Sequence, residues 1–103
     1  MSQFAHHVFF SLKDRRPEKI ESLVAACQEH LDGHEGQTYF AVGKRNPDMV
    51  REVNDDRFDV SLHLAFADRA AHDRYQVHPR HDAFIAAQKE NWAEVRVFDS
   101  DLA

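Results

Sequence analysis

Cysteine, glycine and proline are scarce in this sequence of 103 residues, which holds one cysteine, three glycines and three prolines. Because Cys27 has no second cysteine to pair with, no disulfide within the chain can hold the fold together. The few glycines form no Gly-rich loop for binding phosphate groups, and there is no serine nucleophile elbow. The sequence therefore gives no support to nucleotide-dependent or acyl-enzyme mechanisms.

Positive charge is also in short supply, because 13 lysine and arginine residues face 18 acidic residues and the formal net charge is −5. A chain without an excess of cations cannot neutralise many phosphates, so we expect no nucleic-acid partner. No apolar run approaches a transmembrane length, and we expect no membrane association. Cys27 lies on the apolar stripe of an expected helix, which fits a buried thiol in a reducing compartment, and we expect a cytoplasmic location.

The sequence does contain enough apolar residues for one small domain. A content of 43% hydrophobic and 30% charged residues fits a single globular domain over residues 1–103. A domain of this size buries only about two-thirds of its unfolded surface. Its stability is therefore small, and association with a second copy would add to it.

Alternation of apolar and polar residues predicts four strands. They are expected at Gln3 to Lys13, at about Gln37 to Lys44, at Phe58 to Phe66, and from Val95 to Phe98. The first strand is apolar on both faces, as is typical of a central strand that is covered on both sides. A turn-rich polar loop from Arg45 to Asp56 separates the second and third strands and is a candidate for a rim or a partner contact.

Helical spacing predicts two helical regions between these strands. The first begins at Pro17 and stops at Gly33, with one apolar stripe formed by Ile20, Leu23, Val24, Cys27 and Leu31. The second is capped by Asp68 and is interrupted at His78-Pro79, because proline disfavours the helical conformation of the residue before it. Beyond this break, one helical face carries His81, Phe84, Ile85, Gln88 and Trp92.

The resulting order is β-α-β-β-α-β, which predicts a ferredoxin-like α+β fold with one four-stranded antiparallel sheet and both helices on one face. The other face of the sheet would be uncovered. It would carry Ala5, His7, Phe9, His63 and Ala65, a set too apolar to face water. We therefore expect a homodimer in which two such faces pack sheet on sheet.

The break in the second helical region places several chemically active residues in one space. Tyr75 and His81 from this region, and His6 from the first strand, are all expected to point between the sheet and the helices, together with Trp92. An apolar pocket that holds an imidazole pair and a phenol suits proton transfer to and from a small organic molecule. His81 would be about the third residue of its helix, where the helix dipole keeps the ring neutral.

Each of these residues also has a structural interpretation. His81 could be a buried histidine whose ring is satisfied by a carboxylate or a carbonyl, and Tyr75 needs a hydroxyl partner whether or not a ligand supplies it. For His78 we favour the structural role, since the residue before Pro79 can cap the new helix.

Metal-ligand spacing is poor in this sequence. His78 and His81 are separated by the helix break, and no His-Glu-x-x-His helix exists. His7 and His63 could be cross-strand neighbours, for which an interface role outranks a metal site. We therefore expect no metal ion and no other cofactor.

Several stretches together resemble one known family. They are the opening run His6 to Lys13, the third-strand run Phe58 to Asp68, the motif Tyr75-x-x-His78-Pro79-x-His81, Trp92, and the closing Val97-Phe98-Asp99. With these features nearly the whole chain resembles the stress-responsive α/β-barrel (Dabb) domain proteins, within the wider group of dimeric α+β barrels. The resemblance implies a homodimer whose two sheets pack into a barrel.

The resemblance also implies roles for individual residues. In a plant polyketide cyclase of this family, which closes a linear polyketide by aldol condensation without a cofactor, the catalytic tyrosine and histidine match Tyr75 and His81. Its remaining site residues match His6 in the pocket, and His78 and Asp99 in supporting positions, with Asp99 orienting His81. The expected pocket lining is Val8, Phe10, Leu23, Val24, Cys27, Phe84 and Trp92.

Three functional interpretations follow. The first is a cofactor-independent cyclase, lyase or isomerase that uses His/Tyr acid-base chemistry on a small enolisable, polyketide-like substrate. The second is a non-catalytic, stress-associated dimeric barrel in which the motif anchors the helix break to the sheet. The third, and weakest, is a haem- or quinone-type monooxygenase, as found among other dimeric α+β barrels.

Overall fold

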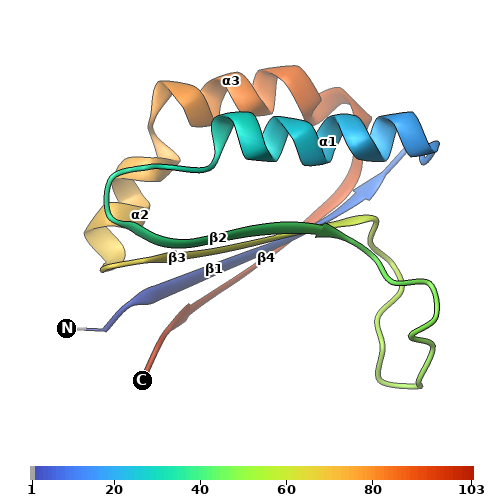
Figure 1. The fold of residues 1–103 in the computed structure, drawn as a ribbon, viewed down its shortest axis with the longest axis horizontal. Coiled ribbons are helices and arrows are strands. Elements are labelled where there is room, and N and C mark those ends of the chain that lie inside the picture. Colours follow the sequence, from blue (N-terminus) through green and yellow to red (C-terminus); the bar gives the residue numbers. More distant parts are fainter. Residues whose placement is uncertain (1) are drawn as a thin grey trace.

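The computed structural model describes residues 2–103, which form one antiparallel sheet with helices on a single face (Figure 1). Along the chain the elements are β1 (Phe4–Leu12), α1 (Pro17–His30), β2 (Gln37–Lys44), β3 (Val60–Phe66), α2 (Arg69–Gln76), α3 (Pro79–Gln88), a 3₁₀ turn η1 (Lys89–Asn91) and β4 (Trp92–Asp101). The strand order in the sheet is β2-β3-β1-β4. This is the ferredoxin-like α+β arrangement that the sequence predicts.

The pairing register of β1 decides which side chains share a face of the sheet. Val8 lies opposite Val97 on the face that the helices cover. His7 lies opposite His63 of β3 and Phe98 of β4, on the other face. Within residues 2–103, no element covers this second face, which stays open in a single copy of the chain (Figure 1).

Helix α1 begins where the sequence predicts. Pro17 is its first residue, where a fixed φ and a missing N–H cost nothing, and Glu18 stands in the first turn, where the helix dipole favours an acidic side chain. Leu23 and Cys27 of the apolar stripe are fully buried. Burial raises the pKa of the Cys27 thiol to about 12, so the thiol stays protonated at neutral pH.

The break in the second helical region is also present, and residues 77–78 separate α2 from α3. Asp68 caps α2 by accepting a hydrogen bond from the backbone N–H of Ala71 at 2.9 Å. Nδ1 of His78 caps α3 by accepting from the N–H of Arg80 at 3.0 Å. His78 thus satisfies one of the free donors at the start of α3, which is the structural role favoured for it.

Strand β3 is shorter than predicted, because it begins at Val60 and not at Phe58. The alternation fails at Asp59, which is buried and accepts hydrogen bonds from the N–H of Leu12 and from Nε of Arg15, both at 2.9 Å. Phe58 contacts the ring of Phe9 on the open face, at a centroid distance of 5.1 Å. The carboxylate of Asp59 therefore turns inward to accept these hydrogen bonds, and the alternation of apolar and polar residues does not continue through this position.

Strand β4 begins earlier than predicted, at Trp92 and not at Val95. The sequence pattern placed Trp92 on the face of the preceding helix, but that helix ends at Gln88 and the turn η1 redirects the chain. Trp92 pairs with Leu12 of β1 instead. Its indole still reaches the core, where it lies 5.1 Å from the ring of Phe10.

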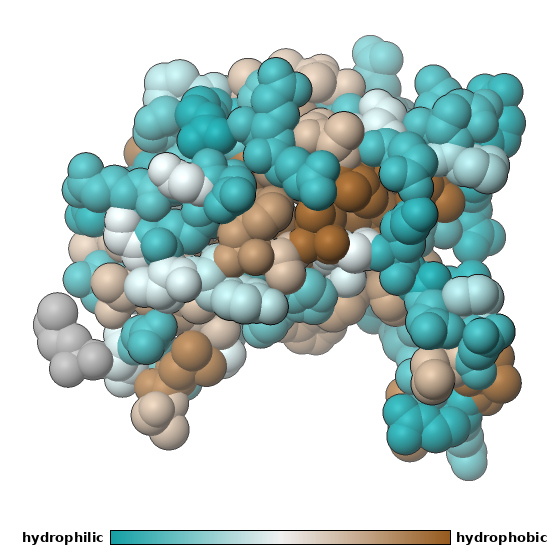
Figure 2. Space-filling view, in the orientation of Figure 1, coloured by the Kyte–Doolittle hydropathy of each residue, from teal (hydrophilic) through white to brown (hydrophobic). Residues whose placement is uncertain are grey.

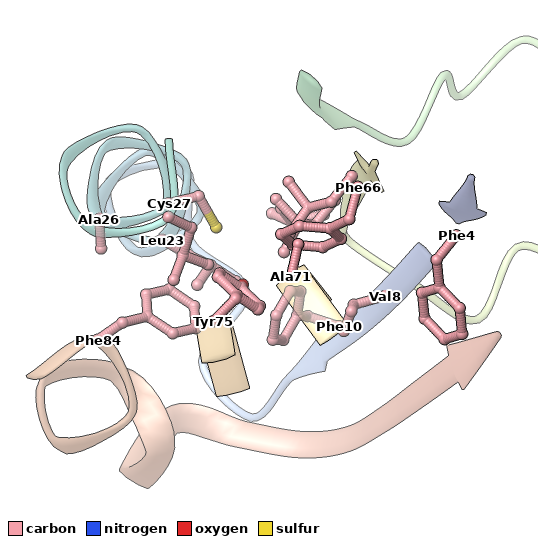
Figure 3. Close-up of a cluster of buried hydrophobic side chains, with 14 of the residues drawn as sticks. Phe4, Val8, Phe10, Leu23, Ala26, Cys27, Phe66, Ala71, Tyr75 and Phe84 are labelled. Carbon is pink, nitrogen blue, oxygen red and sulfur yellow. The ribbon is translucent and has the colours of Figure 1, made fainter. Parts of the chain in front are cut away.

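The core lies between the helices and the covered face of the sheet (Figure 3). Figure 3 shows Leu23 and Cys27 on α1, and Phe84 on α3, facing side chains that rise from the sheet. The largest fully buried side chains are Phe66, Leu23, Leu31, Leu62, Leu64, Val60 and Cys27. This cluster is the main source of stability.

The long connection between β2 and β3 extends away from the rest of the molecule (Figure 1). It exposes three apolar side chains, Met49, Val50 and Val53. Figure 2 shows apolar residues within the hydrophilic surface of this extension, and a larger apolar strip lies between α1 and β2.

Among the described residues, no helix is both long and apolar enough to cross a membrane.

Replacing Gly36 with alanine is expected to lower the free energy of unfolding by about 2–4 kcal/mol. Gly36 has a φ of +80°, which L-residues rarely adopt, and a Cβ at this position would lie 2.5 Å from Cβ of Ala71 on α2. Gly33 provides a matched control, because its φ is +78° but a Cβ there would have no neighbour within 4 Å. Gly33→Ala should therefore lower the free energy of unfolding, measured by chemical denaturation, by only about 1–2 kcal/mol. Equal losses in the two variants would contradict a close contact between Gly36 and α2.

Candidate active site

A cavity of about 190 Å³ lies between the helices and the β1–β4 side of the sheet. Its polar groups come from His6, Tyr75, Gln76 and His81. The rest of the lining is aliphatic or aromatic and consists of Val8, Phe10, Leu31, Leu62, Phe84, Ile85, Trp92, Val95 and Val97. A few polar groups in an apolar wall are typical of sites for small organic molecules.

His81 enters the cavity because of the helix break. It is the third residue of α3, and Pro79 and the His78 cap fix where that helix begins. Nδ1 of His81 is buried and has no hydrogen-bond partner among the described residues. Burial lowers the pKa of the His81 ring, although the neighbouring Asp82 carboxylate opposes this effect. The ring is therefore neutral at pH 7 and can accept a proton.

Tyr75 lies beside His81, with 5.0 Å between the two ring centroids. It comes from the last turn of α2 and is only 2% exposed. Its ring packs on Phe66 of β3 and on His34, at centroid distances of 5.1 Å and 4.9 Å. Burial raises the pKa of Tyr75, so the phenol remains a hydrogen-bond donor well into the alkaline range.

His6 faces these two residues from β1, and its ring centroid lies 6.1 Å from that of Tyr75. Nδ1 of His6 contacts Oδ1 of Asp99 at 2.5 Å. The family resemblance implied that Asp99 orients His81, but the structure pairs it with His6 instead. The reason is the sheet register, which places Asp99 of β4 directly opposite His6. Burial lowers the pKa of His6, while the hydrogen bond to Asp99 acts in the opposite direction.

Seven apolar residues were predicted to line the cavity, and four of them do so: Val8, Phe10, Phe84 and Trp92. Leu23, Val24 and Cys27 do not reach it. They belong to α1, which packs against α3, β2 and β3, and only Leu31 at the C-terminal end of its apolar stripe reaches the cavity. The sequence shows that a stripe is buried but not which part of the sheet it covers.

Two polar residues near the cavity were missing from the predicted site. Gln76 lines the cavity, and its Nε2 lies 3.5 Å from Nε2 of His6. His72 is 9% exposed, and its ring centroid lies 4.8 Å from that of His6. The spacing i, i+3 between His72 and Tyr75 places both on one face of α2, and this signal could have identified His72.

The open face of the sheet carries a separate histidine pair. The Nδ1 atoms of His7 and His63 lie 2.9 Å apart, which requires one ring to donate and the other to accept. The cross-strand contact expected for these residues is thus present. Burial lowers the pKa of His63, and the His7 ring acts in the same direction.

The geometry of the cavity supports one kind of chemistry. A neutral imidazole and a protonated phenol lie side by side in surroundings that contain few other polar groups. The imidazole can remove a proton from carbon, and the phenol can donate a hydrogen bond to the oxygen on which negative charge develops.

The sequence and the fold are similar to those of known proteins. The family model described as "Stress responsive A/B Barrel Domain" matches residues 4–102. A dimeric ferredoxin-like protein of unknown function from Thermobifida fusca has a TM-score of 0.82 and 18% identity, over 98% of this chain and 92% of that chain. A Dabb family protein from Mesorhizobium loti has a TM-score of 0.80 and 22% identity, over 100% and 99% of the two chains.

A hydroxynitrile lyase from Passiflora edulis is also similar, with a TM-score of 0.79 and 16% identity over 99% of this chain and 94% of that chain. No curated protein matches this sequence. At such identities the solved structures establish the fold alone. The match of the family model to nearly every residue goes further: the chain belongs to the stress-responsive A/B barrel domain (Dabb) family.

Proposed function

We propose that this protein is a cofactor-independent lyase, cyclase or isomerase that uses His81 and Tyr75 on a small enolisable, polyketide-like molecule. The observation that carries the proposal is the buried Nδ1 of His81, which has no partner among residues 2–103 and belongs to a ring that lines an apolar cavity. A buried nitrogen without a partner is costly to a fold, and a bound substrate would supply the missing contact.

In the proposed reaction, neutral His81 removes a proton from the carbon next to a carbonyl group. The electron pair of the broken C–H bond forms an enolate, whose oxygen accepts a hydrogen bond from the Tyr75 hydroxyl. The enolate then attacks a second carbonyl, expels a leaving group, or is reprotonated elsewhere, and the His81 imidazolium returns its proton. His6, held by Asp99, faces the reacting molecule from the opposite wall.

The main alternative is a non-catalytic barrel in which the motif is an anchor. That role requires His81 to hold the helix break through polar contacts, and its unpartnered Nδ1 counts against this. The anchoring contact belongs to His78, which caps α3. The hydroxynitrile lyase with the same fold is consistent with lyase chemistry on this scaffold.

A panel of small β-keto compounds and enolisable lactones tests the proposal. Wild type is compared with a variant that combines Tyr75→Phe and His81→Ala, in buffer that contains EDTA. The proposal predicts that at least one compound reacts faster with wild type than with the variant. The same background rate for both proteins on every member would refute it.

We also infer that the protein is a homodimer formed through the open sheet face. The support is an apolar and aromatic surface on that face, where Phe98 is 53% exposed and Tyr39 is 58% exposed. Single apolar side chains are common on the surface of a monomer, whereas a gathered set of them is typical of an interface. The similar protein from Thermobifida fusca is described as dimeric.

A further inference from the structure

A cluster of three metal-ligand side chains lies beside the cavity. His6 of β1, His72 of α2 and Asp99 of β4 each offer one ligand atom, and these atoms all lie within 4.8 Å of one another. Donors around a tetrahedral ion with bonds of about 2.0–2.2 Å are separated by roughly 3.4 Å. Small side-chain rotations would therefore bring the three donors onto one ion.

His72 has the hydrogen bonding expected of a metal ligand. Its Nε2 is buried and has no hydrogen-bond partner among residues 2–103, although the residue is 9% exposed. Its other ring nitrogen, Nδ1, lies 3.2 Å from Oδ1 of Asp73. A carboxylate on Nδ1 holds the proton there and leaves a lone pair on Nε2, as in the carboxylate–histidine pairs that support metal sites.

The other two members are suited to the same role. His6 is 5% exposed, and its imidazole offers a ring nitrogen as one of the three ligand atoms. Asp99 belongs to the edge strand, and its side chain is 41% exposed, which gives an ion access from solvent. A cation could take up both members of the 2.5 Å contact between His6 and Asp99 as ligands.

We propose that His6, His72 and Asp99 bind a divalent transition-metal ion of the zinc class. Two imidazoles and one carboxylate suit Zn²⁺, Co²⁺ or Mn²⁺ and leave at least one position open for water or another ligand. The site would join β1, α2 and β4. Metal-ligand spacing along the sequence does not reveal this site, because its ligands come from three elements that are far apart in the sequence.

Isothermal titration of tag-free, EDTA-treated and dialysed protein with ZnCl₂ tests this site, with Co²⁺ absorption as a second readout. We expect one ion per chain. His72→Gln should weaken binding by at least about 100-fold, and Asp73→Asn should weaken it by about 10–100-fold, since it removes the group that orients His72. His30→Gln removes a histidine at the end of α1, outside the cluster, and should leave the affinity unchanged.

Binding that survives His72→Gln with wild-type affinity would overturn the proposal, as would wild type that binds neither Zn²⁺ nor Co²⁺. If His72→Gln fails to fold by circular dichroism, Asp99→Asn replaces it, because this residue lies on an exposed edge and its loss leaves the core intact. The readout is ion binding, so its outcome is independent of the His81 chemistry, which is assayed in EDTA.

Discussion

The variant His81→Ala is expected to lower kcat/KM for the enolisable substrate by about 10²–10⁴-fold, which is the usual contribution of a general base. Tyr75→Phe should lower it by about 10²–10³-fold, since it removes the donor to the developing enolate oxygen. The combined variant should lose less than the product of the two single losses, because the two groups act on one transition state. Steady-state kinetics of the three variants measure these losses.

The pH dependence of kcat/KM follows from the same two groups. Burial lowers the pKa of His81 below its ordinary value of 6.5, so the base stays neutral at neutral pH and becomes protonated only in more acidic solution. The rate should therefore be constant near pH 7 and fall as the pH drops below about 6.5. No alkaline decline is expected near pH 9 or 10, because burial raises the pKa of Tyr75 and the phenol stays protonated.

A structural role for His81 would produce a different pattern. An anchor predicts that His81→Ala lowers the melting temperature by several degrees, as about 1 kcal/mol or more of polar contact is lost. With Nδ1 unpartnered, we expect an unchanged or slightly higher melting temperature. His30→Ala serves as the matched histidine control and should change neither the rate nor the melting temperature. A lower melting temperature together with an unchanged rate would contradict the catalytic assignment.

The elements that the sequence predicts well are those in which one local signal dominates. The stripe of α1 and its Pro17 start, the Asp68 cap and the proline break before α3 all act within a few residues, and the structure has each of them. The alternation in β1 likewise predicts both faces of the sheet. Such local signals predict the order of the elements along the chain and whether each is a helix or a strand.

The boundaries that were wrong depend on contacts between distant residues. Asp59 leaves the strand pattern because its carboxylate serves the N–H of Leu12, which no period-two rule can anticipate. In the sequence, Trp92 continues the helical spacing of apolar residues, but in the structure the helix ends before the turn at Lys89–Asn91. In both places tertiary hydrogen bonding and chain reversal outweigh periodicity.

The residues of the candidate site likewise fall into two groups, those that one local motif brings together and those that meet only in the folded sheet. Tyr75 and His81 come from one short motif, and the structure places them in contact. The partner of Asp99 depends on the register between β1 and β4, which the sequence does not encode locally, and it is His6. His72 lies outside the motif and meets His6 across the interlayer space, although its i, i+3 spacing to Tyr75 places it on the same face of α2. Residues that lie in one motif are therefore more readily predicted than residues that meet across the sheet.

The open face of the sheet leads to the prediction with the largest expected effect, which is that Phe98→Asp converts the homodimer into monomers. Phe98 is 53% exposed in a single chain and lies on the edge strand β4, with its ring 5.7 Å from that of Phe9 on the central strand β1. A carboxylate buried there without a partner costs about 3 kcal/mol or more. In a twofold interface each change occurs twice, so the dissociation constant should rise by roughly four powers of ten.

Light scattering after size-exclusion chromatography, at micromolar concentrations, measures this change directly. Val77→Asp is the matched control, because it places the same charge on an apolar side chain that is 76% exposed but lies in the helix break, on the covered side of the sheet. It should leave the dimer intact. Circular dichroism must show the same fold in both variants. A wild type that is monomeric, or a Phe98→Asp variant that dimerises as wild type does, would contradict a homodimer formed through the open face of the sheet.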